Sequence, residues 1–316
     1  MTSPTDALVA SGLTKRFAER EAVSNLSFRV PTGRAFGLLG PNGSGKTTTV
    51  RMLTGLLRPT GGTVTLFGQR LDTASADALR GRIGVQTDTN LYESLSVRDN
   101  LQIWGELYGL APAVVRQKAG EVLEVLGLSE RVDSLVGQLS KGMRQKLSVG
   151  RAVLHEPDLL FLDEPTAGLD PEASADLIDY LKEMIRTLNT TLIICTHQLH
   201  GLESLCDELG IIRQGRLVIT GEVQSLLRRR WPEKRYRLSA AGDPAAVRAA
   251  ITAVIGAEAE VVVTGDHCEF AVPEDEAISR VIARLVRDGL GVRAVVPQYP
   301  TIQDLYFATL NDGSPS

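Results

Sequence analysis

The sequence lacks a hydrophobic run long enough to cross a membrane. Its apolar stretches, such as Leu159 to Leu162 and Leu209 to Ile212, are far shorter than the roughly 20 residues that a transmembrane helix needs. The opening residues, MTSPTDALVASG, have neither the basic start nor the apolar core of a secretory signal. We therefore expect a chain that has no membrane span and stays in the cytoplasm.

Cysteine is scarce, and positive charge is not in excess. Cys195, Cys206 and Cys268 are the three cysteines. Their spacing and odd number indicate reduced thiols that pack as small hydrophobic side chains, and they do not indicate metal ligands. The chain has 34 Lys and Arg against 38 Asp and Glu, a formal net charge of -4. Because nucleic-acid-binding proteins usually carry a basic surface, we expect no nucleic-acid partner.

The 316 residues are enough for about two domains. Residues 1–228 alternate short β-rich runs with longer helical patterns, which is typical of an α/β domain. The continuous apolar runs at 159–162 and 191–195 predict central parallel strands that are covered on both faces. The spacing of apolar residues over 173–188 predicts an amphipathic helix. We therefore predict a first domain, residues 1–228, built on a parallel core sheet.

After Arg228-Arg229-Arg230 the pattern changes to shorter elements. We expect strands over residues 236–239, 260–264, 268–272 and 292–296, and helices over residues 244–255 and 276–287. This βαββαβ order is that of a ferredoxin-like unit, so we predict a small C-terminal α+β domain over residues 229–316. The arginine triplet has two interpretations, a patch for an anionic partner or the solvated end of a helix whose dipole favours cations there.

The clearest motif is GPNGSGKT, which follows the apolar run 35–39. It fits the pattern G-x-x-x-x-G-K-[ST] of a P-loop (Walker A) and lies between a predicted strand and a predicted helix. The expected binding residues are Gly40, Pro41, Asn42, Gly43, Ser44, Gly45, Lys46, Thr47 and Thr48. The backbone amides of such a loop surround phosphate, Lys46 reaches the β- and γ-phosphates, and Thr47 offers an oxygen to Mg²⁺. The motif predicts nucleotide binding.

Two carboxylates follow the apolar run at 159–162, namely Asp163 and Glu164. Ligands of α/β sheets bind at the carboxyl ends of the strands. We expect Asp163 to hold the magnesium shell and Glu164 to orient or deprotonate the attacking water. A P-loop with this pair does not by itself separate kinases, GTPases, helicases and transport ATPases.

The segment LSKGMRQ, residues 139–145, narrows the choice. It resembles the signature motif of ATP-binding cassette (ABC) proteins, usually LSGGQ, with Lys141 in place of the second-position glycine and Met143 in place of the glutamine. Alone, the segment is also an ordinary serine cap on a helix. Its place between the P-loop and Asp163-Glu164 favours the resemblance, which extends over residues 7–228.

Other residues match this family in chain order. Asp170 ends a stretch that resembles the D-loop, and His197 resembles the switch histidine that senses the γ-phosphate. Phe17 resembles the aromatic residue that stacks on adenine, with a core phenylalanine as the competing interpretation. A metal site formed by His197, His200 and Glu203 at helical spacing is a further alternative, which the match of His197 to the switch position disfavours.

The Q-loop departs from the family pattern. The family's spacing, counted from Ile83, reaches Asp88, whereas the glutamine of this sequence is Gln86. Either side chain is a candidate ligand of the metal ion, and the spacing favours Asp88.

The resemblance implies a P-loop NTPase cassette with a parallel core sheet, an antiparallel β subdomain and a helical subdomain, which hydrolyses ATP with Mg²⁺. In this family, two cassettes pair head to tail, so the second cassette is another copy of the chain or a homologue. The P-loop of one cassette and the signature serine of the other, here Ser140 followed by Gly142, enclose the same ATP.

The resemblance also implies a separate integral-membrane permease, which would place the chain at the cytoplasmic face of the cell membrane. The signature together with the C-terminal extension that ends near residues 300–306 resembles the ABC-2 group, which predicts export. Residues 91–110, with Trp104 and Tyr108, either receive the permease or pack between helices. The alternatives in function are a soluble ABC-type ATPase that acts on nucleic acid or ribosomes, and an ATP-binding module without turnover.

Overall fold

The computed structural model describes residues 6–72, 74–87, 91–199, 201–256, 259–265, 267–272 and 274–312. The chain divides into two compact units, one of Met1–Val223 with Tyr306–Ser316 and the other of Gln224–Leu305. We expected the boundary between residues 228 and 229, whereas the first unit ends at Val223 and also includes the residues from Tyr306 onward. Two residues discussed above, Asp88 and His200, lie outside the described residues.

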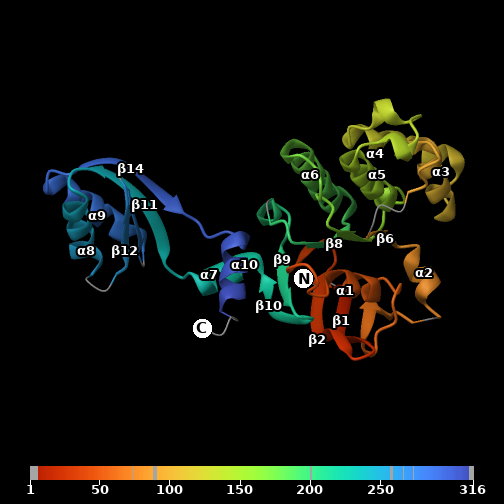
Figure 1. Cartoon of the computed structure of the whole chain (residues 1–316), viewed down its shortest axis with the longest axis horizontal. Coiled ribbons are helices and arrows are strands. Elements are labelled where there is room, and N and C mark those ends of the chain that lie inside the picture. The colour runs from red at the N-terminus through yellow and green to blue at the C-terminus, as the bar shows by residue number, and fades with distance from the viewer. Residues whose placement is uncertain are drawn as a thin grey trace. The chain divides into compact units, whose positions relative to one another are not determined.

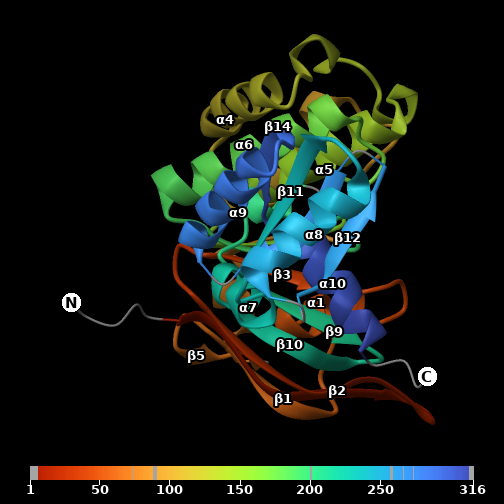
Figure 2. The ribbon, with the colours of Figure 1, turned by 90° about the vertical axis from the view of Figure 1, so that its left-hand side faces the viewer.

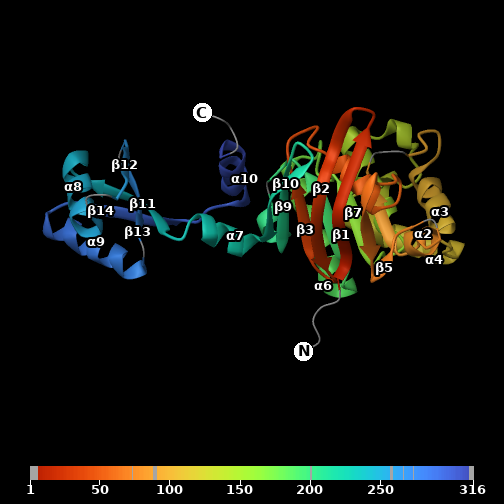
Figure 3. The same ribbon diagram turned by 90° about the horizontal axis from the view of Figure 1, so that it is seen from below.

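The first unit contains two sheets (Figure 3). The antiparallel sheet has the order β2-β1-β4-β5, with β1 (Asp6–Phe17), β2 (Arg20–Pro31), β4 (Gly61–Leu66) and β5 (Gln69–Arg70). The other sheet has the order β10-β9-β3-β8-β7-β6, with β3 (Ala35–Leu39), β6 (Ile83–Gln86), β7 (Leu159–Asp163), β8 (Thr191–Thr196), β9 (Glu208–Arg213) and β10 (Arg216–Glu222). Its strands are parallel except β10, which pairs antiparallel with β9. The predicted parallel core and antiparallel β subdomain are confirmed.

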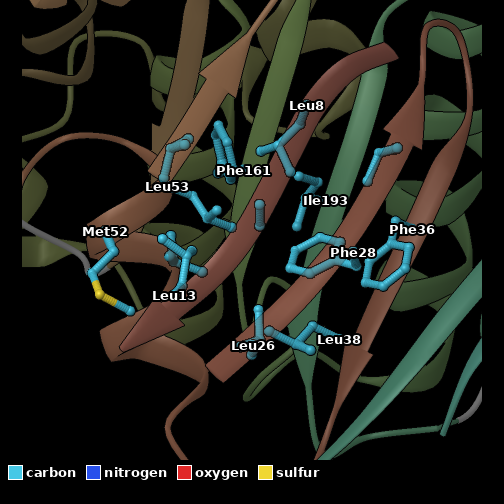
Figure 4. Packing of buried hydrophobic residues seen from close by; sticks show 14 of the residues in the cluster. Leu8, Leu13, Leu26, Phe28, Phe36, Leu38, Met52, Leu53, Phe161 and Ile193 are labelled. Carbon is cyan, nitrogen blue, oxygen red and sulfur yellow. The ribbon is translucent and has the colours of Figure 1, made fainter. Parts of the chain in front are cut away.

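The main core lies between these two sheets (Figure 4). Every residue of β3, β7 and β8 is buried, as their continuous apolar runs predict. Phe28 of β2 stacks on Phe36 of β3 with ring centroids 4.7 Å apart, and Phe161 and Ile193 join the same cluster. Burial of each such side chain stabilises the fold by about 1.5–3 kcal/mol. The strands that carry the site are therefore anchored in a packed core.

Helices complete the first unit. Three of them are α1 (Lys46–Leu53), α2 (Ala76–Arg80) and α6 (Pro171–Leu188), and short 3₁₀ turns span Ser129–Arg131, Val136–Gln138 and Leu202–Ser204. The predicted amphipathic helix over 173–188 is confirmed by α6. A helical subdomain consists of α3 (Val97–Leu107), α4 (Pro112–Val125) and α5 (Lys141–Val153), which lie together (Figure 1).

Trp104 of α3 and Tyr108, which follows the last residue of α3, pack within this first unit. The Arg151 guanidinium lies 4.6 Å from the Trp104 ring centroid. Tyr108 stacks on His155 with centroids 3.6 Å apart and planes 6° apart. Burial lowers the pKa of His155 to about 4, so this ring is neutral at physiological pH. These contacts agree with the interpretation in which Trp104 and Tyr108 pack between elements of the chain.

The second unit has the element order predicted from the sequence. It contains β11 (Lys234–Ala241), α8 (Pro244–Ile255), β12 (Val261–Thr264), β13 (His267–Val272), α9 (Asp275–Arg287) and β14 (Gly291–Gln298), with strand order β12-β13-β11-β14. The strands pair antiparallel, and α8 and α9 lie side by side (Figure 2). Leu238, Phe270, Ile251 and Val281 belong to its separate core.

Two helices stand where the chain passes between the units, α7 (Val223–Arg230) and α10 (Ile302–Asn311). The arginine triplet occupies the last turn of α7, where cations complement the helix dipole, as the helix-end interpretation predicts. All three cysteines are free and buried, which confirms their packing role. Within the described ranges, no helix has both the length and the apolarity of a membrane span.

Candidate active site

A cavity of about 540 Å³ lies at the carboxyl ends of the parallel strands. It is lined by Phe17, Arg20, Ala22, Asn42, Gly43, Gly45, Lys46, Thr47, Thr48, Thr87, Asp163 and Glu164. The loop from Gly40 to Gly45 connects the end of β3 to the start of α1. Gly45 has φ +110, and a Cβ there would lie 2.7 Å from the Ala22 carbonyl oxygen, so only glycine fits. The strand, loop and helix predicted around the motif are all present.

Lys46 holds a positive charge at the centre of this loop. Its Nζ donates hydrogen bonds to the carbonyl oxygens of Gly40 at 2.7 Å and Pro41 at 3.3 Å. It also lies 3.6 Å from Glu164 Oε1. Ser44 Oγ is buried, and no described group bonds to it. The ammonium, the hydroxyl and the amides at the start of α1 together form a site suited to phosphate oxygens.

Asp163 lies beside Thr47 and Gln86. Thr47 Oγ1 donates to Asp163 Oδ2 at 2.7 Å, and the Asp163 amide donates to Gln86 Oε1 at 3.1 Å. The other carboxylate oxygen, Oδ1, is buried without a partner in the described part of the chain. Burial raises the pKa of Asp163, and the Thr47 hydrogen bond partly offsets this rise. Carboxylate, hydroxyl and amide oxygens suit Mg²⁺, and the unbonded buried oxygen fits such a role.

Glu164 is held by groups at the end of β8. Its backbone has φ 52, a left-handed conformation that is uncommon for residues other than glycine. Its carboxylate accepts from Thr196 Oγ1 at 2.7 Å and from the His197 amide at 3.1 Å. His197 Nδ1 lies 2.7 Å from the same carboxylate. The structure thus brings together Lys46, Glu164 and His197, which are far apart in the sequence.

The residues of the predicted signature and D-loop lie elsewhere in the same unit. Ser140 caps α5, where its Oγ accepts from the Met143 amide at 3.2 Å. Gly142 belongs to the first turn of α5, and Asp170 caps α6 by accepting from the Ala173 amide at 2.8 Å. As far as the described residues define the cavity, Ser140, Gly142 and Asp170 do not line it.

Phe17 lines the cavity at the end of β1 and is 48% exposed. The Lys15 ammonium lies 5.2 Å from its ring centroid. The core interpretation of Phe17 is therefore wrong, because the ring is accessible beside the P-loop. An exposed aromatic ring beside the P-loop is suited to stacking.

Five residues near the site were missed by the sequence analysis, namely Arg20, Ala22, Thr87, Gln145 and Thr196. Thr196 ends β8 directly before His197, so the rule that ligands bind at strand ends would have found it. Thr87 follows Gln86 for the same reason. Arg20 and Ala22 reach the cavity through the pairing of β1 with β2, and no local motif marks them.

Comparison with known proteins agrees with this geometry. The family described as ABC transporter matches residues 23–167. Over 225 residues the chain is 42% identical to the Nod factor export ATP-binding protein I of Ralstonia nicotianae, a match that covers 71% of this chain and 69% of that protein. The chain belongs to the ABC transporter family. As a cassette of this family, it binds and hydrolyses ATP to power transport, which confirms the prediction from the motifs.

Two further relatives and a solved structure of this ABC family are similar to the chain. The chain is 36% identical over 236 residues to the linearmycin resistance ATP-binding protein LnrL of Bacillus subtilis, covering 74% of this chain and 75% of that protein. It is 40% identical over 230 residues to the daunorubicin/doxorubicin resistance ATP-binding protein DrrA of Streptomyces peucetius, a match that covers 72% of this chain and 69% of that protein. A solved ATP-binding subunit of an ABC transporter matches with TM-score 0.65 and 30% identity, covering 72% of this chain and 93% of that one. The fold predicted for the first domain is confirmed.

Proposed function

We propose that this ABC cassette drives export through a separate integral-membrane permease of the ABC-2 type. The observation that supports this most is that its relatives carry the names of Nod factor export and antibiotic resistance ATP-binding proteins. Such a subunit works at the cytoplasmic face of the cell membrane and is held there by the permease.

Within the site, Thr47, Asp163 and Gln86 would hold Mg²⁺ beside the phosphates of ATP. The contacts of Asp163 with both Thr47 and Gln86 support this set. Asp88, which the family's spacing favours, lies outside the described residues and stays a prediction. The ion, when bound, supplies charge stabilisation to the transferring phosphoryl group.

Glu164 would act as the group that orients and deprotonates the attacking water. Its carboxylate is already directed by Thr196 and His197, so little rearrangement of this side chain is needed. Lys46 and the loop residues Gly40–Gly45 would hold the phosphates, and Phe17 would stack on the adenine ring. His197, which touches Glu164, would report the presence of the γ-phosphate.

Ser140, Gly142 and Asp170 support a head-to-tail pair of cassettes. These residues do not line the described cavity of their own chain, so their proposed contacts with ATP require a second cassette, either another copy or a homologue. The start of α5 points backbone amides outward, and such a terminus attracts the γ-phosphate. ATP then favours the closed pair, and hydrolysis removes that preference.

A membrane pull-down tests the export proposal. Tagged Glu164→Gln chain with ATP is incubated with solubilised native membranes, and Lys46→Ala chain serves as the matched control that lacks the main phosphate contact. We expect a polytopic membrane protein to co-purify, and purified permease with this cassette to restore transport in vesicles. Recovery of ribosomes or DNA without a membrane protein would contradict the proposal and favour a soluble ABC-type ATPase.

A further inference from the structure

A buried glutamine connects the signature helix to the catalytic turn of the same chain. Gln145 lies in α5 and is 7% exposed. Its Nε2 donates to the carbonyl oxygen of Glu164 at 2.9 Å and lies 3.2 Å from that of Pro165. A single amide group therefore reaches two successive carbonyls just after β7, and the Glu164 carbonyl oxygen also accepts from the Ala167 amide at 3.1 Å.

This contact holds a strained part of the backbone. Glu164 adopts a left-handed conformation with φ 52, and such residues persist only where the surroundings determine them strongly. The Glu164 amide donates to the Cys195 carbonyl oxygen at 2.7 Å, which holds the peptide group before this residue. Gln145 contacts the carbonyl of the peptide group after it, so the backbone that carries the Glu164 side chain depends in part on where α5 lies.

The start of α5 also lies close to Gly168 and Leu169, a few residues further along the chain. A Cβ at Gly142 would lie 3.3 Å from the Gly168 carbonyl oxygen and 3.4 Å from Leu169 Cδ2. Ser140, which caps this helix, lies at the end that the proposed pairing directs to the ATP of the other cassette. Displacement of α5 by that ATP would therefore be transmitted to the carbonyls of Glu164 and Pro165 through Gln145.

We propose that Gln145 is a positioning residue that couples the Ser140 end of α5 to Glu164 of the same chain. When the Ser140 end of α5 binds the ATP of the other cassette, the rate of hydrolysis of the ATP in the chain's own P-loop changes. The inference rests on the proposed head-to-tail pairing and adds to it a route between the two ATP sites.

The test uses the full chain with Gln145→Leu, which removes the donor, and Gln145→Glu, which keeps the shape and also lacks the donor when ionised. The matched control is Thr190→Val. Thr190 is 2% exposed, and its Oγ1 donates to the Pro157 carbonyl oxygen at 3.1 Å, at the opposite end of β7. This control loses a buried hydrogen bond to a backbone carbonyl far from Glu164.

We expect both Gln145 variants to lower kcat on the order of tenfold, a change typical for the loss of a supporting contact. The KM for ATP should stay within about twofold of wild type, ATP-dependent pairing should persist, and the Hill coefficient for ATP should fall towards one. Thr190→Val should keep wild-type values of all four quantities. This pattern separates positioning from a general loss of structure.

Two results would overturn the coupling. One is a wild-type kcat and Hill coefficient in both Gln145 variants, while wild-type chain pairs with ATP. The other is loss of ATP binding, pairing and turnover together in both variants, which would give Gln145 a purely structural role. A wild-type chain that hydrolyses ATP without pairing would instead contradict the proposed pairing itself, so the two failures are distinguishable.

Discussion

The two units of this chain each combine a sheet with helices, and the candidate catalytic and nucleotide-binding side chains meet in the first of them. In the first unit β3, β7 and β8 run parallel, so the P-loop, Glu164 and His197 all follow strand ends at one edge. In the second unit neighbouring strands of the sheet pair antiparallel, so the carboxyl ends of neighbouring strands fall at opposite edges. Strand direction therefore decides which unit can assemble a site from residues far apart in the sequence.

Substitution of Glu164 in the first unit should have the largest effect on hydrolysis. Glu164→Gln should keep ATP affinity and lower hydrolysis on the order of 10²–10⁴-fold, because an amide cannot accept the proton of water. Steady-state phosphate release checks the rate, and calorimetry checks the affinity. The matched control is Glu183→Gln on the exposed part of α6, where Glu183 pairs with Arg186. Wild-type turnover in Glu164→Gln would remove this residue from its role.

Lys46→Ala should weaken ATP binding about 10- to 100-fold, because a charged hydrogen bond contributes roughly 1.5–3 kcal/mol. Titration with ATP in the presence of Mg²⁺ measures the dissociation constant. Lys182→Ala removes an exposed lysine that pairs with Asp179 on α6, and it should bind ATP like wild type. Unchanged affinity in Lys46→Ala would contradict the assignment of the phosphate site.

Two substitutions, Gln86→Ala and Asp88→Ala, test which of these side chains binds the metal ion. The Gln86 contact with the Asp163 amide leads us to expect a loss of hydrolysis of about tenfold in Gln86→Ala, with a raised Mg²⁺ requirement. Titration of activity with Mg²⁺ separates the two variants. If Asp88→Ala loses more activity, the spacing counted from Ile83 is the better guide, and Gln86 only supports the backbone of Asp163.

A core substitution in the second unit should have the smallest effect on hydrolysis. Phe270→Ala should destabilise that unit by about 3–5 kcal/mol, because Phe270 is 3% exposed in its core. Hydrogen exchange should show faster opening of residues 224–305, while turnover stays within about twofold of wild type. Val262→Ala, at a position that is 45% exposed, should change neither. A tenfold loss of turnover in Phe270→Ala would show that the units are functionally dependent.

Local patterns were enough to predict much of the first unit. The P-loop is a contiguous motif, and the pair Asp163-Glu164 follows a run of buried apolar residues, so each can be recognised without the rest of the fold. The same holds for α6, whose apolar spacing predicts nearly its whole length. In the second unit, the order of elements follows from short alternating runs and their turns.

Contacts between distant segments could not be predicted in this way. Gln145 reaches Glu164 only because α5 packs against the end of β7, and Arg20 reaches the cavity only because β2 pairs with β1. The grouping of residues from Tyr306 onward with the first unit likewise depends on packing. Such features arise from the three-dimensional arrangement and leave no spacing in the chain.

The mass of the ATP-bound chain shows whether ATP brings two cassettes together. Glu164→Gln chain is measured by light scattering with and without ATP, alongside the same chain carrying Ser140→Arg, which places a large side chain at the start of α5. We predict that ATP doubles the mass of the Glu164→Gln chain, whereas the double variant keeps the mass of one chain, although both bind ATP. A double variant that still pairs would contradict the role of Ser140, and ATP-bound Glu164→Gln that remains a single chain would contradict pairing between copies of this chain.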